Sequence, residues 1–502
     1  MKVLVANPPA YFRPNLIRHF IQAGSRWSFS LKIPKNGGIK DHYLPYPFFL
    51  AYTTALLKRD TDAEVRGFDA DALDLDDVEF VEWVVKYRPD LVIIEVPTVS
   101  FPLTMNALKR IKDELPDVKI AVAGGHITAL TEEVMREYPF IDFALLGEYE
   151  LTAKRLVEVL IKGDINDLRD VNGIVFRRGD QLIHGRGRTL IPNLDDLPYP
   201  DREDFDVNLY HDFEIAGKPT IQMLSSRGCP YSCIFCLERH VIYASPIYRM
   251  RDPVKVVDEI EHVKYKYNAK QVYFDDMNTT LNKKHIIGIA QELINRKLDI
   301  PWACMGDINI DQETLRLLAK SGCVGVKFGV ESINPNALRT INKLFVSHHK
   351  VEKFNKSAKD LGMFTHATYT IGLPEDTRED ILATLRFALK LGTDSAQFSI
   401  ATPLPGTPFF NIAREREWLI TYDWTMYDGA NYAVLSYPHL SNKEIEMLYH
   451  LAVNLWWIKK KGLVKGTVNY LLKYPTNPFK FIKRFGIRET AKLVGEFLDT
   501  IT

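Results

Sequence analysis

The stretch Ser226-Arg227-Gly228-Cys229-Pro230-Tyr231-Ser232-Cys233-Ile234-Phe235-Cys236 holds three of the chain's five cysteines within eight residues. It follows a predicted strand directly, so its loop lies at the carboxyl end of that strand. Three thiolates on one tight loop can hold three irons of a four-iron, four-sulfur cluster. The other two cysteines, Cys304 and Cys323, are remote in sequence and lie in or beside apolar runs. One iron would therefore stay open for a small molecule. The alternative is a zinc site, which usually takes four ligands in CxxC pairs.

Six β-rich runs alternate with helical patterns around and after this loop. They span residues 220–226, 271–276, 301–306, 325–332, 364–374 and 395–403. Six βα repeats over 220–410 predict a partial (β/α)6 barrel, smaller than a full eight-unit barrel. The chemistry of such a barrel lies at the carboxyl ends of its strands, where the cysteine loop also begins.

Residues 1–165 predict a separate α/β domain before the barrel. The expected strands are 2–6, 64–69, 91–96, 119–125 and 143–148, and the expected helices are 48–59, 76–87, 103–114, 129–137 and 149–161. Near-continuous apolar strands between helices indicate a doubly wound, Rossmann-like parallel sheet that is covered on both faces. Ligands of such sheets bind at the carboxyl ends of the strands.

Two further segments complete the predicted organisation. Residues 166–219 read as a β-hairpin that turns at Gly179-Asp180, followed by a proline-rich linker. Residues 411–502 read as a helical carboxyl-terminal domain. From Leu455 to Thr502 it has ten Lys or Arg against three acidic residues, interleaved with aromatic side chains. Such a surface suits an acidic macromolecule or a membrane face, or else a helical cap on the barrel.

Composition narrows the function classes. The chain has 502 residues, with 64 Lys and Arg against 64 Asp and Glu, and this zero net charge argues against a nucleic-acid binder. Five cysteines do not make a disulfide scaffold. The longest apolar stretch, 47–57, is too short to span a bilayer, and the first residues lack a signal-peptide core. We therefore expect a soluble, cytoplasmic protein.

The cysteine loop and four later motifs resemble the radical S-adenosylmethionine (SAM) superfamily. The loop is C-x3-C-x2-C with an aromatic residue before the last cysteine, Gly329-Val330-Glu331-Ser332 resembles GIES, Gly372-Leu373-Pro374-Glu375 resembles GLPGET, and Pro405-Gly406-Thr407-Pro408 resembles PGTP. The fourth motif is Asp275-Asp276 at the end of the second barrel strand. The resemblance, over about 220–410, implies that Cys229, Cys233 and Cys236 bind the cluster and that Phe235, Asp275, Asp276, Glu331, Ser332, Gly372 and Leu373 contact SAM. Taken singly, the later motifs could be turns or helix caps.

An α/β domain before such a core is similar to the cobalamin-binding subfamily. That resemblance rests on NPP after the first strand, GG after the fourth and GE-x-E after the fifth. It implies a cobalamin site formed by Asn7, Pro8, Thr98, Ser100, Gly124, Gly125, His126, Gly147 and Glu148. No DxHxxG motif occurs, so the lower axial position of cobalt is unassigned. The alternatives are a domain that has lost cobalamin and, for His126, an ordinary polar residue in a turn.

The resemblance implies methylation of an unactivated sp3 carbon. A 5′-deoxyadenosyl radical would abstract hydrogen, and methylcobalamin would supply the methyl group. One candidate target is the glutamine Cα of methyl-coenzyme M reductase. The alternative is a cobalamin-dependent cyclase or rearrangement enzyme without net methyl transfer. Catalytic residues are not identified. The implied partners are a reductant protein such as ferredoxin or flavodoxin and a substrate that is a small molecule or a protein.

Overall fold

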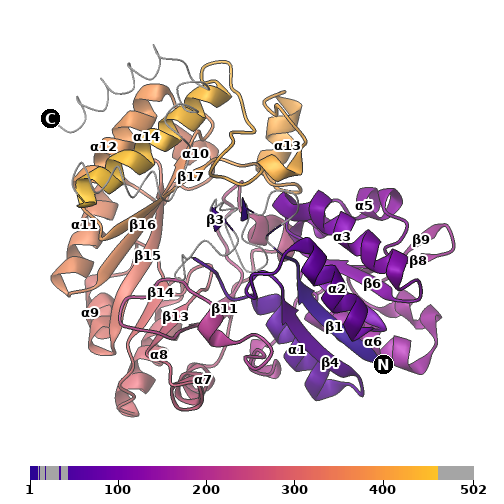
Figure 1. The fold of residues 1–502 in the computed structure, drawn as a ribbon. Helices are drawn as coiled ribbons and strands as arrows, with labels where there is room; N and C mark the ends of the chain where they lie inside the picture. The colour runs from indigo at the N-terminus through magenta and orange to yellow at the C-terminus, as the bar shows by residue number, and fades with distance from the viewer. Residues whose placement is uncertain (10, 12–16, 19–32, 35–42, 462–502) are drawn as a thin grey trace.

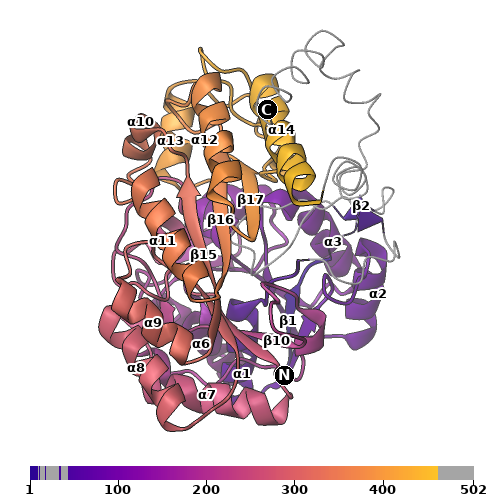
Figure 2. The same cartoon turned by 90° about the vertical axis from the view of Figure 1, so that its left-hand side faces the viewer.

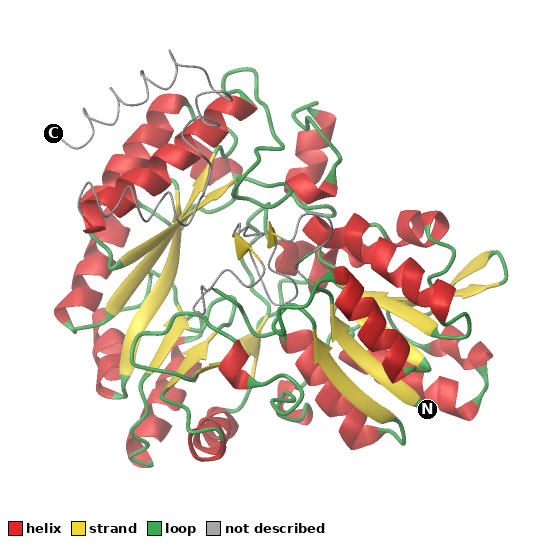
Figure 3. Ribbon diagram, in the orientation of Figure 1, coloured by secondary structure: helices red, strands yellow, loops and turns green. Residues whose placement is uncertain are grey.

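A computed structural model describes residues 1–9, 11, 17–18, 33–34 and 43–461 of the chain. Two sheets with their own helices lie side by side, the amino-terminal one in indigo to magenta and the second in pink to orange (Figure 1). Figure 3 shows both sheets in yellow with red helices around them. A short antiparallel pair, β2 (Ile17–Arg18) and β3 (Ile33–Pro34), belongs to neither sheet.

The amino-terminal sheet has seven strands in the order β4-β1-β5-β6-β7-β8-β9. Its bounds are β1 (Lys2–Asn7), β4 (Glu64–Asp69), β5 (Leu91–Glu95), β6 (Lys119–Ala123), β7 (Phe143–Leu145), β8 (Ile174–Arg178) and β9 (Gln181–His184). The first five are parallel, as the apolar runs predict. The hairpin turns at residues 179–180 as expected, but it extends this sheet, because β8 pairs antiparallel with β7 and β9 pairs antiparallel with β8.

Helices cover both faces of this sheet, which confirms the doubly wound prediction. The helices are α1 (Phe48–Asp60), α2 (Asp77–Tyr87), α3 (Phe101–Glu114), α4 (Gly125–Ala129), α5 (Thr131–Glu137) and α6 (Glu150–Lys162). Along β1, Val3 and Val5 join the core beneath α1 and α6, whereas Leu4 and Ala6 join the core beneath α2 and α3. This alternation follows from the two-residue period of a strand. The single helix expected over 129–137 is instead α5, preceded by the separate short helix α4.

The second sheet is a six-stranded parallel half-barrel in the order β10-β13-β14-β15-β16-β17. Its strands are β10 (Thr220–Met223), β13 (Gln271–Phe274), β14 (Trp302–Met305), β15 (Cys323–Glu331), β16 (Phe364–Ile371) and β17 (Ser395–Ile400). The helices α7 (Pro253–Lys266), α8 (Lys283–Asn295), α9 (Gln312–Lys320), α10 (Pro335–Thr340), α11 (His348–Asp360) and α12 (Arg378–Leu391) lie on its outer side (Figure 2). The six predicted strands and the partial barrel are confirmed.

Short elements connect these units. They are the antiparallel pair β11 (Ser226–Arg227) and β12 (Arg249–Met250), the π-helix η5 (Glu238–Ile242), and the 3-10 turns η1 (Thr98–Ser100), η2 (Ile165–Asp170), η3 (Leu194–Asp196), η4 (Val207–Leu209) and η6 (Trp424–Met426). The turn η1 contacts η6, and α4 contacts η5, so the two halves of the chain meet at these elements.

After the barrel, α13 (Pro408–Glu415) and α14 (Asn442–Lys461) flank an irregular stretch. The helix α14 packs on β17 and α12. The helical prediction for 411–502 is therefore right for α14 but wrong for 416–441, where Gly429, at a φ of 63°, and Pro438 both disfavour a helix. Residues 462–502, with most of the basic aromatic stretch, lie outside the described residues. Within the described part of the chain, no helix combines the length and hydropathy needed to cross a membrane.

Candidate functional site

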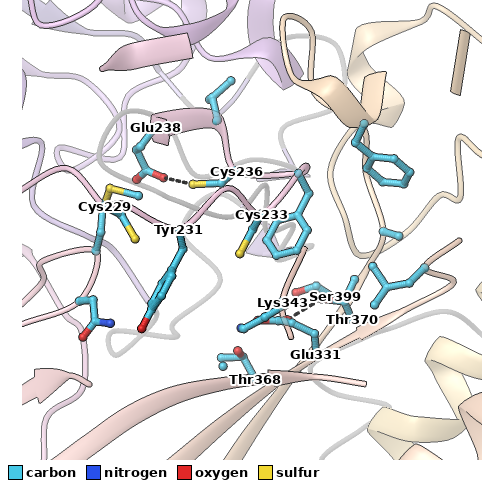
Figure 4. A pocket seen from close by; sticks show the side chains of 18 of the residues that line it. Cys229, Tyr231, Cys233, Cys236, Glu238, Glu331, Lys343, Thr368, Thr370 and Ser399 are labelled. Carbon is cyan, nitrogen blue, oxygen red and sulfur yellow. Dashed lines mark hydrogen bonds and ion pairs between the residues drawn. The ribbon is translucent and has the colours of Figure 1, made fainter. Parts of the chain in front are cut away.

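A cavity lies at the carboxyl ends of the barrel strands, next to the cysteine loop. All three clustered cysteines line it, and Figure 4 shows their side chains spread around its upper wall. The opposite wall comes from strand ends and the loops after them. It includes Met305, Asp307, Gly329, Glu331, Thr368, Thr370, Ser399 and Thr402. The cavity is thus built where parallel α/β sheets place their ligands.

The cysteine loop has its shape because of one glycine and a few backbone hydrogen bonds. Gly228 has a φ of 89°, and a Cβ there would lie 2.1 Å from the carbonyl oxygen of Ile247. Only glycine fits such a close approach. Further along, the Cys236 N–H donates to the Cys233 carbonyl over 3.1 Å. The imidazole Nε2 of His240, on η5, lies 3.1 Å from the same carbonyl. These contacts fix the two later cysteines relative to each other.

The three thiols suit an iron–sulfur cluster. Burial raises the pKa of Cys229 to about 11 and also raises the pKa values of Cys233 and Cys236. Each side chain is therefore a protonated thiol until a metal takes the place of the proton. Across the described residues, no three His, Cys, Asp or Glu side chains are grouped closely enough to ligate one ion. A four-iron cluster takes soft sulfur ligands, and three thiolates can each bind one of its irons. These thiols occupy three separate points around one cavity (Figure 4).

A buried ion pair forms the floor of the cavity. The Lys343 ammonium donates to Glu331 Oε1 over 2.5 Å, and the Thr370 hydroxyl donates to Glu331 Oε2 over 2.8 Å. Burial acts to lower the pKa of Lys343, but the negative charge of Glu331 outweighs it, and the pKa is raised. Glu331 has a φ of 63° at a register shift of β15. Strained backbone of this kind gathers at binding sites. A Cβ at Gly329 would lie 2.5 Å from both charged groups.

A second polar group stands beside the cysteines. The Tyr231 hydroxyl donates to Asp307 Oδ2 over 2.9 Å, and the Asn278 amide donates to the same oxygen over 3.1 Å. The Tyr231 ring stacks on Phe345 with centroids 4.1 Å apart. Burial and then Asp307 raise the pKa of Tyr231, so the side chain stays a neutral phenol. This contact ties the cysteine loop to the end of β14.

Of the seven residues predicted to contact SAM, three line the cavity and four do not. Phe235, Glu331 and Leu373 line the cavity. The other four, Asp275, Asp276, Ser332 and Gly372, are not part of its wall. Asp276 accepts from the Ser225 N–H at 2.7 Å, and Ser332 donates to Asp376 at 3.2 Å. The Gly372 carbonyl accepts from the Tyr437 hydroxyl at 2.9 Å. These contacts show Asp276, Ser332 and Gly372 holding the loops behind the cavity. The role of all seven toward SAM stays a prediction.

The predicted cobalamin edge lies against the segment that follows Cys236. A Cβ on Gly125 would come within 2.7 Å of the Leu237 side chain, and one on Gly147 within 2.7 Å of the Ile242 carbonyl oxygen. Gly125 and Gly147, which the resemblance places at the cobalamin site, thus also allow close packing of the two halves. The loops at the carboxyl ends of β6 and β7 therefore pack against residues that lie one and six positions after Cys236.

Other members of the predicted cobalamin set are buried at the same edge. The Asn7 amide donates to Asp69 over 2.9 Å, and Ser100, Pro8 and Gly124 complete the strand ends. His126 is 1% exposed, with Nδ1 3.3 Å from the Thr98 hydroxyl. Its ring packs on Phe101 and Trp424. Burial lowers its pKa to about 3, so the imidazole is neutral. Contact of these residues with cobalamin stays a prediction.

Glu148 takes part in a buried network across the two halves. Arg227, two residues before Cys229, donates over 2.7 Å to both Glu148 and Glu150. Arg249 donates to the other Glu148 oxygen at 2.7 Å. The guanidinium of Arg227 also lies over the Tyr52 ring, 4.9 Å from its centroid. Both glutamates of the GE-x-E motif therefore bind Arg227, at the start of the cysteine loop.

Several residues that line the cavity were not predicted from the sequence. Thr368 and Thr370 carry a detectable signal, since they alternate with Ala367, Tyr369 and Ile371 toward the carboxyl end of a predicted strand. Lys343, Tyr231 and Asp307 carry none, because lysine and aspartate in loops usually point to solvent. They enter the site only through the tertiary fold.

Comparisons with known proteins match both halves. The family profile described as Radical SAM superfamily matches residues 223–388, and that of the B12 binding domain matches residues 41–157. An uncharacterized methyltransferase, PH0819, of Pyrococcus horikoshii is 31% identical over 420 residues, which cover 84% of this chain and 89% of the relative. The anaerobic magnesium-protoporphyrin IX monomethyl ester cyclase of Cereibacter sphaeroides is 27% identical and covers 76% of this chain, but only 62% of its own length is matched.

A solved structure shares the fold. The cobalamin-dependent S-adenosylmethionine radical enzyme OxsB, with aqua-cobalamin and S-adenosylmethionine bound, superposes with a TM-score of 0.65 at 17% identity. The match covers 92% of this chain and 70% of OxsB.

Proposed function

The chain belongs to the cobalamin-dependent radical SAM methyltransferases, and from this premise we propose that it methylates an unactivated sp3 carbon. The cofactors of this class are a four-iron, four-sulfur cluster, SAM and cobalamin. When bound, they supply a carbon-centred radical and a transferable methyl group. A peptidyl carbon, such as the glutamine Cα of methyl-coenzyme M reductase, is one target consistent with this chemistry.

One observation supports the proposal most strongly. The carboxyl edge of the amino-terminal sheet meets the cysteine loop at Gly125 and Leu237, one residue after Cys236. Methyl transfer to a carbon radical needs both cofactors beside the same substrate atom, because only positioning protects a short-lived radical. A radical generator alone would have no use for a second ligand-binding edge at this place.

In this proposal the chain's own groups bind, orient and shield. Cys229, Cys233 and Cys236 hold the cluster. Glu331, oriented by Lys343 and Thr370, faces the cavity and can accept hydrogen bonds from a ligand. The apolar part of the wall keeps water away from the reacting carbon; it consists of Phe235, Leu237, Met277, Met305, Ile308, Phe345, Leu373, Ile400 and Phe409.

A second candidate function is ring formation or rearrangement without net methyl transfer. The similarity to the magnesium-protoporphyrin ester cyclase favours this alternative, since that relative covers three quarters of the chain. Both functions need the same radical chemistry, so the cavity alone does not separate them. They differ in the fate of the SAM methyl group.

Product stoichiometry tests the proposal. The reconstituted protein is incubated with SAM, a low-potential reductant and candidate substrates, and nucleoside products are quantified by mass spectrometry. Methyl transfer predicts S-adenosylhomocysteine and 5′-deoxyadenosine in about equal amounts, one of each per methylated product. Substrate turnover that yields 5′-deoxyadenosine without S-adenosylhomocysteine would reject methylation and support the cyclase alternative.

A further inference from the structure

The outer side of the cysteine loop is open to solvent. Pro230 and Ser232 are exposed, whereas Cys229, between Gly228 and Pro230, is buried. The three cysteines and Tyr231 line the cavity, whereas Pro230 and Ser232 are exposed to solvent. Pro230 follows Cys229 directly and Ser232 precedes Cys233 directly, so an exposed residue adjoins each of the first two cysteines.

The segment between α10 and α11 extends this exposed surface. Its Ile341 carbonyl accepts from the Ile234 N–H at 3.2 Å, and the Asn342 amide donates to the Ser232 carbonyl at 3.4 Å. Leu344 lies two residues after Asn342 and is 67% exposed, which is a large fraction for a leucine side chain. The Asn342–Ser232 hydrogen bond joins the exposed residues of the two segments, Pro230, Ser232, Asn342 and Leu344, and we call this set the cluster-loop face.

The segment that carries Asn342 and Leu344 is rich in basic residues. From Pro335 to Lys356 the chain has five Lys or Arg and a single acidic residue, Glu352, although its overall charges cancel. Lys343 is buried in its pair with Glu331, but the other four cations are exposed: Arg339, Lys350, Lys353 and Lys356. Lys350 donates to the Phe345 carbonyl at 3.4 Å, which places it beside Leu344. Arg339 precedes Asn342 by three residues at the end of α10.

We propose that the cluster-loop face is the docking site for an acidic one-electron carrier of the ferredoxin or flavodoxin type. The inference rests on the proposed function, because it requires a cluster on Cys229, Cys233 and Cys236. An apolar centre with a charged rim is the usual composition of a transient interface. A basic rim raises the rate of encounter with an acidic partner, with a strong dependence on salt. In the docked complex the carrier is oxidised by one electron and the cluster is reduced by one electron.

Charge reversal on the rim tests the docking site. The R339E/K350E variant and the wild type are reconstituted with iron and sulfide, and reduced flavodoxin is mixed with each in a stopped-flow absorbance experiment. We expect reduction of the cluster by flavodoxin to slow at least tenfold at low salt and to lose most of its salt dependence. Reduction by dithionite, which needs no protein interface, should stay at the wild-type rate. The K162E/R169E variant reverses two exposed charges on the amino-terminal half and serves as the matched control.

Binding supplies a readout that does not depend on electron transfer. Isothermal titration of oxidised flavodoxin should show at least tenfold weaker binding to R339E/K350E, and weaker binding to L344S, than to wild type or K162E/R169E. Unchanged binding and reduction by flavodoxin in R339E/K350E would overturn the docking site, as would equal slowing with dithionite. The proposed function would survive either result, provided that the wild-type cluster is still reduced by dithionite in the presence of SAM.

Discussion

The buried network at Arg227 allows a quantitative prediction. The side chains of Arg227, Glu148 and Glu150 are 2%, 0% and 0% exposed, and Arg227 is the one cation with a described hydrogen bond to Glu150. The R227M variant keeps most of the side-chain volume but leaves Glu150 buried without its cation. Removal of one partner from a buried pair costs about 3–5 kcal/mol. We expect the free energy of unfolding to fall by about this amount.

Urea unfolding followed by circular dichroism measures the loss. The matched control is R186M, which breaks the exposed pair of Arg186 with Asp170, 66% and 72% exposed, and should cost about 0–1 kcal/mol. The R227M/E150Q variant should recover about half of the loss, because a neutral amide replaces the unpaired carboxylate.

The cost of R227M should also depend on pH. Burial and then Glu148 act to raise the pKa of Glu150, and Arg227 opposes them. Without Arg227, the folded pKa of Glu150 rises further above its unfolded value, so folded protein holds a proton that unfolded protein releases. The cost should therefore grow as the pH rises from 5 to 8. A cost equal to that of R186M, or one independent of pH, would refute the account of the network.

Three further predictions concern the cofactors and the amino-terminal half. The C229A/C233A/C236A variant should bind no iron and produce no 5′-deoxyadenosine after reconstitution, whereas wild type should hold about four iron and four sulfide; continued SAM cleavage would contradict the cluster assignment. Bound cob(II)alamin should be base-off and give an electron paramagnetic resonance spectrum without nitrogen superhyperfine splitting; splitting that disappears in H126Q would show that His126 ligates cobalt. Burial lowers the pKa of His126 to about 3, against about 6.5 in the unfolded chain, so its protonation favours unfolding below pH 6.5. This protonation should remove roughly 1 kcal/mol of stability between pH 6.5 and 5.5. An H126Q variant whose urea midpoint keeps the wild-type pH dependence would contradict this.

Much of the fold follows from local sequence. Apolar runs of five or six residues, such as those at 2–6 and 91–96, predict buried parallel strands because only such strands are apolar on both faces. The break between α4 and α5 and the irregular stretch 416–441 were not predicted. Gly429 and Pro438 in the irregular stretch are local signals against a helix. The contact of Trp424 with His126, which joins that stretch to α4, is tertiary, and no local pattern encodes it.

The site was predictable only in part. The spacing of three cysteines correctly predicts that they share one cavity, because residues this close on one loop stay together in any fold. The carboxylates mislead, since Asp276 and Glu148 end predicted strands but hydrogen-bond to protein groups. Lys343 reaches the cavity from a loop twelve residues after Glu331. Sequence spacing cannot show which strand-end side chains turn inward to a cavity and which turn back to hold the loops.

The fate of the SAM methyl group tests the central claim most directly. The reconstituted enzyme is supplied with its substrate, a reductant and SAM that carries a trideuterated methyl group, and the product is analysed by mass spectrometry. The account predicts a product that gains one methyl group with all three deuterons at an sp3 carbon. A product without deuterium, formed while 5′-deoxyadenosine accumulates, would contradict it.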